Sequence, residues 1–237
     1  MPAFLVHGVP DTAMLWDDLR KELTRTDVIA PTMPGFSTPV PDGFDATKDA
    51  YVSWLIEQVE AVGEPVDIVG HDWGSTLVQR LVSLRPDLVR TWAVGSGQLE
   101  TDYVWHDAAQ AWQTPGVGEQ VMDGMTTDVM AGVLAQQGLS PDYARLVAEK
   151  IDGTMKDCVL KLYRSATKVA EDWPPLSAPV PPGLVIFGAD DPYVSPVFGR
   201  HLAERTGARF VSFDGCSHWW PHQRAAEAAA LLNEHWA

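Results

Sequence analysis

Cysteine is scarce in this chain: only Cys158 and Cys216 occur in 237 residues, and they show no paired spacing. This argues against a disulfide framework and a cysteine-ligated zinc site, and it favours a reducing, cytoplasmic setting. Basic residues are also few, 17 Lys and Arg against 32 Asp and Glu, which gives a formal net charge of −15. Such a surface repels phosphate backbones and anionic membranes, so neither nucleic acid nor membrane is expected as a partner.

The chain also lacks a long hydrophobic run. Its first apolar segment, residues 1–6, has no basic region before it and meets His7-Gly8 directly. This pattern predicts a buried strand and excludes a signal peptide or a membrane span. With 46% hydrophobic residues, the chain can bury one large core. We therefore expect a single globular unit, present as a monomer or a homodimer.

Short apolar segments that end in Gly, Pro or Asp recur along the sequence and predict six buried strands, at 3–6, 27–30, 66–69, 91–94, 184–187 and 209–213. Leucine and valine series with i, i+4 spacing predict amphipathic helices between the early strands, around 15–23, 52–59 and 77–84. Because strand and helix alternate, we expect an α/β fold with about six parallel strands and helices on both faces.

A helical segment interrupts this alternation. Between Gln98 and Trp173 the strand pattern disappears, and helix-period segments occupy 129–137, 143–151 and 155–169. Five prolines between 174 and 182 then predict an extended return to the sheet. The chain is thus divided into an α/β core, residues 1–97 and 176–237, and a helical cap or lid, residues 98–175.

Asp72 occupies the centre of a strand–turn–helix motif. Residues 66–75 read VDIVGHDWGS, with glycines flanking the central residue at the spacing of a nucleophile elbow. A strained turn of this kind presents one side chain at the carboxyl end of the sheet. The alternative is an aspartate that only caps the following helix.

Two later motifs supply partners for Asp72. GADD at 188–191 and GCSHWW at 215–220 each follow a predicted strand, so an acid and His218 come after Asp72 in the order nucleophile, acid, histidine. We assign the acid to Asp191, because it stands three residues past the glycine, whereas Asp190 can serve the turn.

HGVP at 7–10 ends the first strand, where the second donor of an oxyanion hole normally lies. We therefore assign the two backbone N–H donors to Val9 and Trp73. The alternative is an ordinary Gly-Pro turn in which His7 is a structural hydrogen-bonding residue.

Together these motifs resemble the epoxide hydrolase and haloalkane or haloacetate dehalogenase branch of the α/β-hydrolase family. The resemblance rests on HGVP with Trp16 after it, GHDWGS at 70–75, GADD and GCSHWW, and it covers nearly the whole chain. The family usually has two strands before the one that carries HG, whereas this chain begins at that strand. We therefore expect the N-terminal antiparallel strands to be missing.

An aspartate nucleophile limits the chemistry. A carboxylate that attacks an ester gives a high-energy anhydride, whereas attack on a saturated carbon gives a stable alkyl ester. Water activated by His218, which Asp191 orients, would cleave that ester at the Asp72 carbonyl. The expected partner is a small-molecule substrate, and neither a metal nor an organic cofactor is required.

The helical segment must select the leaving group. The resemblance implies that epoxide opening uses two lid tyrosines, and the segment LYRS at 162–165 matches one of them, so Tyr163 is the candidate acid. WQTPGVGE, which begins at Trp112, resembles the first lid helix, but the expected first tyrosine falls on Ala108. The residues just upstream can take its place as acid or as pocket residues: Tyr103, Trp105 and His106. Trp112 itself is a further candidate for the substrate-binding pocket.

Three functions remain open. The leading one is an epoxide hydrolase that converts a small or medium uncharged epoxide to a vicinal diol. The second is a haloalkane or haloacetate dehalogenase with the same triad, in which Trp73 donates to halide. Val9, however, stands where many haloalkane dehalogenases carry Asn, and Trp105-His106 reverses the haloacetate dehalogenase order. The third is a ligand-binding pseudoenzyme with a triad but no competent lid.

Overall fold

A parallel sheet of six strands forms the centre of the molecule. The computed structural model describes all residues, Met1 to Ala237, and its strand order is β2-β1-β3-β4-β5-β6. Every neighbouring pair is parallel, so the expected sheet without an antiparallel edge is confirmed. The strands are β1 (Ala3–Val6), β2 (Val28–Ile29), β3 (Val66–His71), β4 (Val89–Gly95), β5 (Gly183–Gly188) and β6 (Arg209–Phe213).

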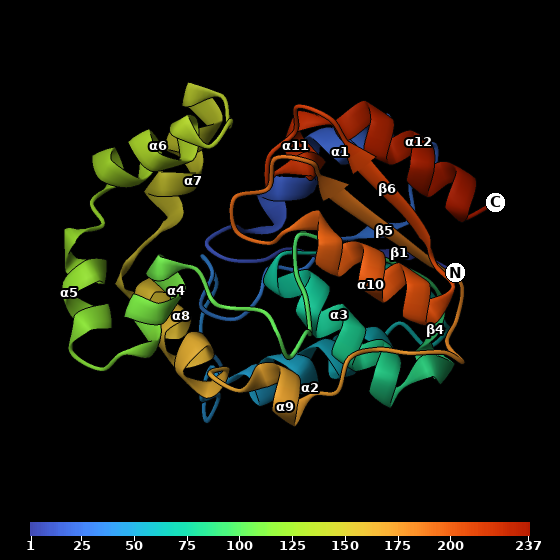
Figure 1. Ribbon diagram of the computed structural model, residues 1–237, viewed down its shortest axis with the longest axis horizontal. Helices are drawn as coiled ribbons and strands as arrows, with labels where there is room; N and C mark the ends of the chain where they lie inside the picture. Colours follow the sequence, from blue (N-terminus) through green and yellow to red (C-terminus); the bar gives the residue numbers. More distant parts are fainter.

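Helices cover both faces of this sheet (Figure 1). One face carries α1 (Asp17–Glu22), α11 (Trp220–Gln223) and α12 (Ala225–His235), and the other carries α2 (Lys48–Glu60), α3 (Trp73–Leu84) and α10 (Pro196–Thr206). The i, i+4 series in α2 is buried as predicted, and Thr47 caps its first turn by accepting from the Ala50 amide. Trp16, just before α1, is fully buried.

Six helices lie between β4 and β5: α4 (Asp107–Gln113), α5 (Val117–Gly124), α6 (Thr127–Gln136), α7 (Pro141–Lys150), α8 (Gly153–Ser165) and α9 (Val169–Asp172). We call this segment, residues 98–175, the helical insertion. In Figure 1 it lies at one side of the sheet, beyond the carboxyl ends of the strands, and both chain termini lie at the opposite side. None of the helices is long and apolar enough to cross a membrane.

The predicted helix at 155–169 is too long. α8 ends at Ser165, and a separate short helix, α9, begins at Val169. The Ser165 hydroxyl donates to the Leu162 carbonyl at 2.8 Å and accepts from the Lys48 amide at 2.8 Å. A serine that bonds to the backbone in this way competes with continued helix, so the chain turns here.

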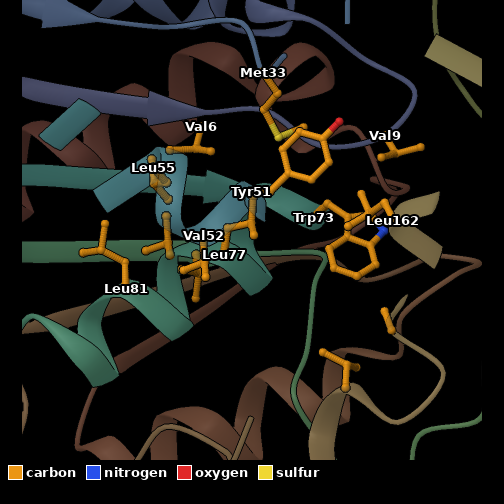
Figure 2. Close-up of a cluster of buried hydrophobic side chains, with 14 of the residues drawn as sticks. Val6, Val9, Met33, Tyr51, Val52, Leu55, Trp73, Leu77, Leu81 and Leu162 are labelled. Carbon is orange, nitrogen blue, oxygen red and sulfur yellow. The ribbon is translucent and has the colours of Figure 1, made fainter. Parts of the chain in front are cut away.

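Two hydrophobic clusters hold the molecule together, and the helical insertion contributes to both. The larger cluster joins α2, α3 and α10 to buried side chains of α4, α5 and α8, among them Trp112 and Leu162. In Figure 2, Val9, Trp73 and Leu162 gather at one end of it. The smaller cluster joins α1, α11 and α12 to side chains of α6 and α7, such as Leu134 and Val147.

Candidate active site

The turn between β3 and α3 presents Asp72 at the carboxyl end of the sheet. Asp72 has φ 54° and ψ −122°, a backbone conformation that costs a non-glycine residue about 1 to 3 kcal/mol. Gly70 and Gly74 permit the turn, because a Cβ on Gly70 would collide with the Gly74 carbonyl and one on Gly74 with the Val6 carbonyl. The sequence motif thus forms the strained elbow that its spacing predicts.

The two oxygens of the Asp72 carboxylate have different partners. Oδ1 accepts a hydrogen bond from the Val9 amide at 2.6 Å, and Oδ2 lies 3.5 Å from Nε2 of His218. Gly8 allows this approach, since a Cβ there would collide with the carboxylate. Trp73 is the first residue of α3, so its backbone N–H belongs to the unpaired amides of a helix N-terminus. One predicted donor thus contacts Asp72 directly, and the other follows it at the start of the helix.

His218 lies between Asp72 and Asp191. Its Nδ1 is 3.0 Å and 3.1 Å from the two carboxylate oxygens of Asp191, and the side chains are 2% and 0% exposed. Asp191 also accepts from the amides of Tyr193 and Val194 at 2.9 Å and 3.1 Å. Asp190 is exposed, so the structure brings Asp191 rather than Asp190 to the histidine.

Charge and burial act in opposite directions on this pair. Burial lowers the pKa of His218, but the two neighbouring carboxylates raise it more, to about 10. Burial raises the pKa of Asp191, whereas His218 and the two amides lower it to a net value below the ordinary one. The pair is therefore an ion pair at neutral pH, with a protonated imidazole beside the carboxylate of Asp72.

Two further histidines hold backbone next to this site. His7 accepts from the Met33 amide at 3.0 Å, and its other ring nitrogen lies 2.9 Å from the Gly8 carbonyl. Burial lowers the pKa of His7 to about 4, so its ring is neutral. His7 thus has the hydrogen-bonding role that the alternative interpretation of HGVP gives it. His71 Nε2 lies 2.9 Å from the carbonyl of His218, which also accepts from the Ser96 hydroxyl at 3.1 Å. The contacts of His71 and Ser96 with the His218 carbonyl fix the loop that carries His218.

A cavity of about 240 Å³ opens beside Asp72 and His218. Three of the predicted lid residues line it: His106, Trp112 and Tyr163. Tyr163, on α8, is 3% exposed, and its ring packs edge-on against Trp73 at 5.4 Å and Trp112 at 4.9 Å. Burial raises the pKa of Tyr163 well above the ordinary value, and the charge of Asp72 adds to this rise.

The other two predicted lid residues, Tyr103 and Trp105, line a smaller pocket of about 20 Å³. This pocket adjoins the cavity, because Asp72, His106 and Tyr163 line both. The Tyr103 hydroxyl donates to the Tyr193 carbonyl at 3.1 Å, and Trp105 stacks on Trp73 at 6.0 Å. All five predicted lid residues therefore lie near Asp72, in two pockets. No group of His, Cys, Asp or Glu side chains is arranged to hold a metal ion.

Comparison with known proteins covers nearly the whole chain. The sequence model described as the alpha/beta hydrolase family matches residues 3–231. The chain belongs to this family. A haloalkane dehalogenase from Psychrobacter cryohalolentis is 27% identical over 98% of this chain and 82% of that protein. An (E)-2-((N-methylformamido)methylene)succinate hydrolase from Acinetobacter baylyi is 25% identical over 81% of this chain and 73% of that protein.

Solved structures agree with this alpha/beta hydrolase fold. A putative ancestral haloalkane dehalogenase superposes with a TM-score of 0.79 at 22% identity, covering 99% of this chain and 92% of that one. A structure from a study of epoxide hydrolases from metagenomes of hot environments gives 0.79 at 19% identity, covering 100% and 91%. At these identities the likeness confirms the fold alone.

The structure of this alpha/beta hydrolase also places residues in the site that the sequence did not single out. Tyr193 lines the cavity, and its ring lies edge-on to His218 at 5.0 Å and 4.8 Å from that of His106. Its place two residues past Asp191 was the only available signal. Ala108, where the first lid tyrosine was expected, lines the same cavity.

Asp11 is a second residue that the sequence did not single out. The side chain is 2% exposed, and only Oδ1 has a well-formed hydrogen bond, from the Thr12 amide at 3.0 Å. It lies beside the side chains of Trp219 and Tyr143, the latter from α7. Burial raises its pKa from 3.8 to about 7. A buried carboxyl thus lies where the helical insertion meets the core.

Proposed function

We propose that this protein is an epoxide hydrolase that converts an uncharged epoxide to a vicinal diol. The observation that carries the proposal is that Tyr163 lines the same cavity as Asp72 and that its ring packs edge-on against Trp73, the residue after Asp72. Burial keeps Tyr163 neutral. A neutral phenol beside a carboxylate is the pair that epoxide opening requires.

In the first step, Oδ2 of Asp72 attacks an epoxide carbon while Val9 holds Oδ1. A carbon–oxygen bond of the ring breaks, its electron pair moves to the oxygen, and Tyr163 gives that oxygen its proton. The product is a hydroxyalkyl ester of Asp72. The Val9 contact leaves the attacking oxygen on the side of the carboxylate that is nearest His218.

In the second step, His218 takes a proton from water and the hydroxide attacks Cγ of Asp72. The oxyanion that forms accepts from the amides of Val9 and Trp73, each worth on the order of 3 kcal/mol. Collapse passes the second proton of the water to the departing alkoxide, releases the diol and restores the carboxylate, while the first proton stays on His218, as in the free protein. Asp191 keeps the imidazole oriented throughout.

The charge on Asp72 determines when His218 can act as a base. In the free protein, the carboxylates of Asp191 and Asp72 both raise the pKa of His218. Formation of the ester removes the charge of Asp72 and therefore part of this effect. The pKa of His218 then falls, so it gives its proton to the Tyr163 phenolate, which restores the phenol, and the neutral imidazole becomes a base at the stage that needs one.

Tyr193 is our candidate for the second donor to the epoxide oxygen. Ala108 has no polar group, whereas Tyr193 lines the same cavity from the loop after β5. Burial raises its pKa to about 12, so its hydroxyl is protonated at neutral pH. In this proposal one donor comes from the helical insertion and the other from the core.

The charge of the cavity disfavours anionic substrates. No lysine or arginine lines it, and the carboxylate of Asp72 lies at its base. A haloacetate would bring a second negative charge next to Asp72, and the protonated His218 beside it is already paired with the carboxylates of Asp191 and Asp72. The same applies to a succinate derivative such as that named for the Acinetobacter relative.

A haloalkane dehalogenase is the second candidate, because Trp73 adjoins Asp72 and the Psychrobacter relative carries that name. Both enzymes would form an ester on Asp72, and they differ in the leaving group. Wild type and Asp72→Asn should be incubated with terminal epoxides and, separately, with haloalkanes. We expect diol from the epoxides, no halide from the haloalkanes, and neither product from Asp72→Asn. Halide release without diol formation would favour the dehalogenase, and no product from either panel would favour a ligand-binding pseudoenzyme.

A further inference from the structure

Polar and apolar side chains both line the cavity. His106, Tyr193 and His218 form a chain of ring contacts of 4.8 Å and 5.0 Å, so these polar groups gather around the reacting carboxylate. α6 forms an apolar wall of the cavity with four side chains, Val129, Met130, Val133 and Leu134, and the polar Gln137 follows them in the lining. Because Asp72 and these side chains line one cavity, an elongated ligand can contact both.

α6 presents two apolar rows to its surroundings. Met130 and Leu134 are spaced i, i+4 and are 7% and 2% exposed, so they form the row that packs into the smaller hydrophobic cluster. Val129 and Val133 have the same spacing, and they line the cavity although they are 51% and 38% exposed. Side chains that face both the cavity and solvent stand at its mouth.

Helix stability does not account for these two valines. Valine is a weaker helix former than alanine, leucine, lysine or glutamate, because its branched side chain loses rotamer freedom in a helix. Two such residues on an exposed helix face gain little from burial. They do extend the apolar wall of the cavity outward to the surface.

We propose that the substrate is an elongated molecule with an uncharged, apolar tail, and that Val129 and Val133 bind this tail where it leaves the cavity. The reacting group of that substrate rests on the proposed function, whereas the tail rests on the α6 wall. Because burial of a methylene favours binding, affinity should increase roughly threefold to fourfold with each methylene that contacts this wall. Val129 and Val133 are then specificity-determining residues.

The test uses unreactive ligands, so that it does not depend on turnover. Vicinal diols of increasing straight-chain length, from butanediol to dodecanediol, are titrated into the full-length protein by calorimetry. Val129→Ser/Val133→Ser is compared with wild type. Val117→Ser is the matched control, because Val117 lies in the same helical insertion, is 43% exposed and does not line the cavity. Circular dichroism and thermal melting verify that each variant is folded.

We expect wild type and Val117→Ser to bind the longer diols progressively more tightly. The double variant should bind the short diols as wild type does and the longest about tenfold more weakly. The proposal is overturned if chain length has no effect, if no diol binds, or if both variants lose equal affinity. Epoxide turnover reports on the proposed function separately: a protein that turns over no epoxide but retains this chain-length dependence would refute only the proposed function.

Discussion

The two halves of the helical insertion are held in different ways. α8 packs on α2 of the core as well as on α4 and α5, all within the larger hydrophobic cluster. α6 packs mainly on α7, and this pair, the α6–α7 hairpin of residues 127–150, contributes to the smaller cluster. In Figure 1 the hairpin stands at the edge of the molecule, whereas α8 lies beside α2.

This difference separates two tasks. The firmly packed half holds Tyr163, whose hydroxyl, in the proposed mechanism, has to meet a reacting atom to within a fraction of an ångström. The α6–α7 hairpin supplies an apolar wall, which tolerates displacement because hydrophobic contact is not directional. We therefore expect changes in the firmly packed half, which contains α4, α5 and α8, to affect the rate of the chemistry. Changes in the α6–α7 hairpin should affect substrate choice and stability.

The largest expected effect follows from removing one hydroxyl in the firmly packed half. Tyr163→Phe should lower kcat/KM on epoxides about 100-fold to 10,000-fold, the range for a general acid, with little change in stability. Tyr143→Phe is the control, because Tyr143 lies on α7 and does not line the cavity. It should cost at most a few-fold. Equal losses in the two variants would contradict the division of tasks.

Asp11 tests the contact between the hairpin and the core. Its folded-state pKa is raised from 3.8 to about 7, so its contribution to stability is complete below about pH 4 and is lost as the pH rises through about 7. Asp11→Asn cannot titrate. The free energy of unfolding of this variant, relative to wild type, should therefore increase by on the order of 3 kcal/mol between pH 4 and pH 8. Urea unfolding across this range measures it, and a difference independent of pH would show that the Asp11 carboxyl is not desolvated.

Gln223 gives the smallest expected effect. Its Nε2 donates to the Gly138 carbonyl at 2.8 Å, and its Oε1 accepts from the Ser217 amide at 2.8 Å. Gln223 thus joins the turn between α6 and α7 to Ser217, the residue before His218. Gln223→Ala should cost about 1 kcal/mol of stability and accelerate hydrogen exchange in α6 and α7, but not in α8. Gln120→Ala, an exposed glutamine of α5, is the control; uniform acceleration across the insertion would contradict a separate hairpin.

Much of the fold could be predicted because it depends on local patterns. Continuous apolar segments such as 3–6 identify strands that are covered on both faces, and the i, i+4 series in α2 identifies a helix with one buried face. The meeting of Asp72, Asp191 and His218 could be predicted too. Each follows a strand of one parallel sheet, and parallel strands bring their carboxyl ends to the same edge.

The features that the sequence did not reveal depend on contacts between distant segments. α8 ends at Ser165, whose hydroxyl accepts a hydrogen bond from the Lys48 amide, 117 positions away. Asp11 resembles an ordinary turn residue until Tyr143 and Trp219 cover it. The position of Tyr193 over His218 depends on the path of the loop that also carries Asp191. None of these three contacts produces a periodic pattern in the sequence.

The central claim is that Asp72 forms a covalent ester that His218 then cleaves. Intact-protein mass spectrometry of His218→Ala after incubation with an epoxide tests it directly, because this variant can form the ester but lacks the base that removes it. We predict an adduct equal in mass to the whole epoxide, absent from Asp72→Asn/His218→Ala. Absence of any adduct, or an adduct that persists when Asp72 is replaced, would contradict the account.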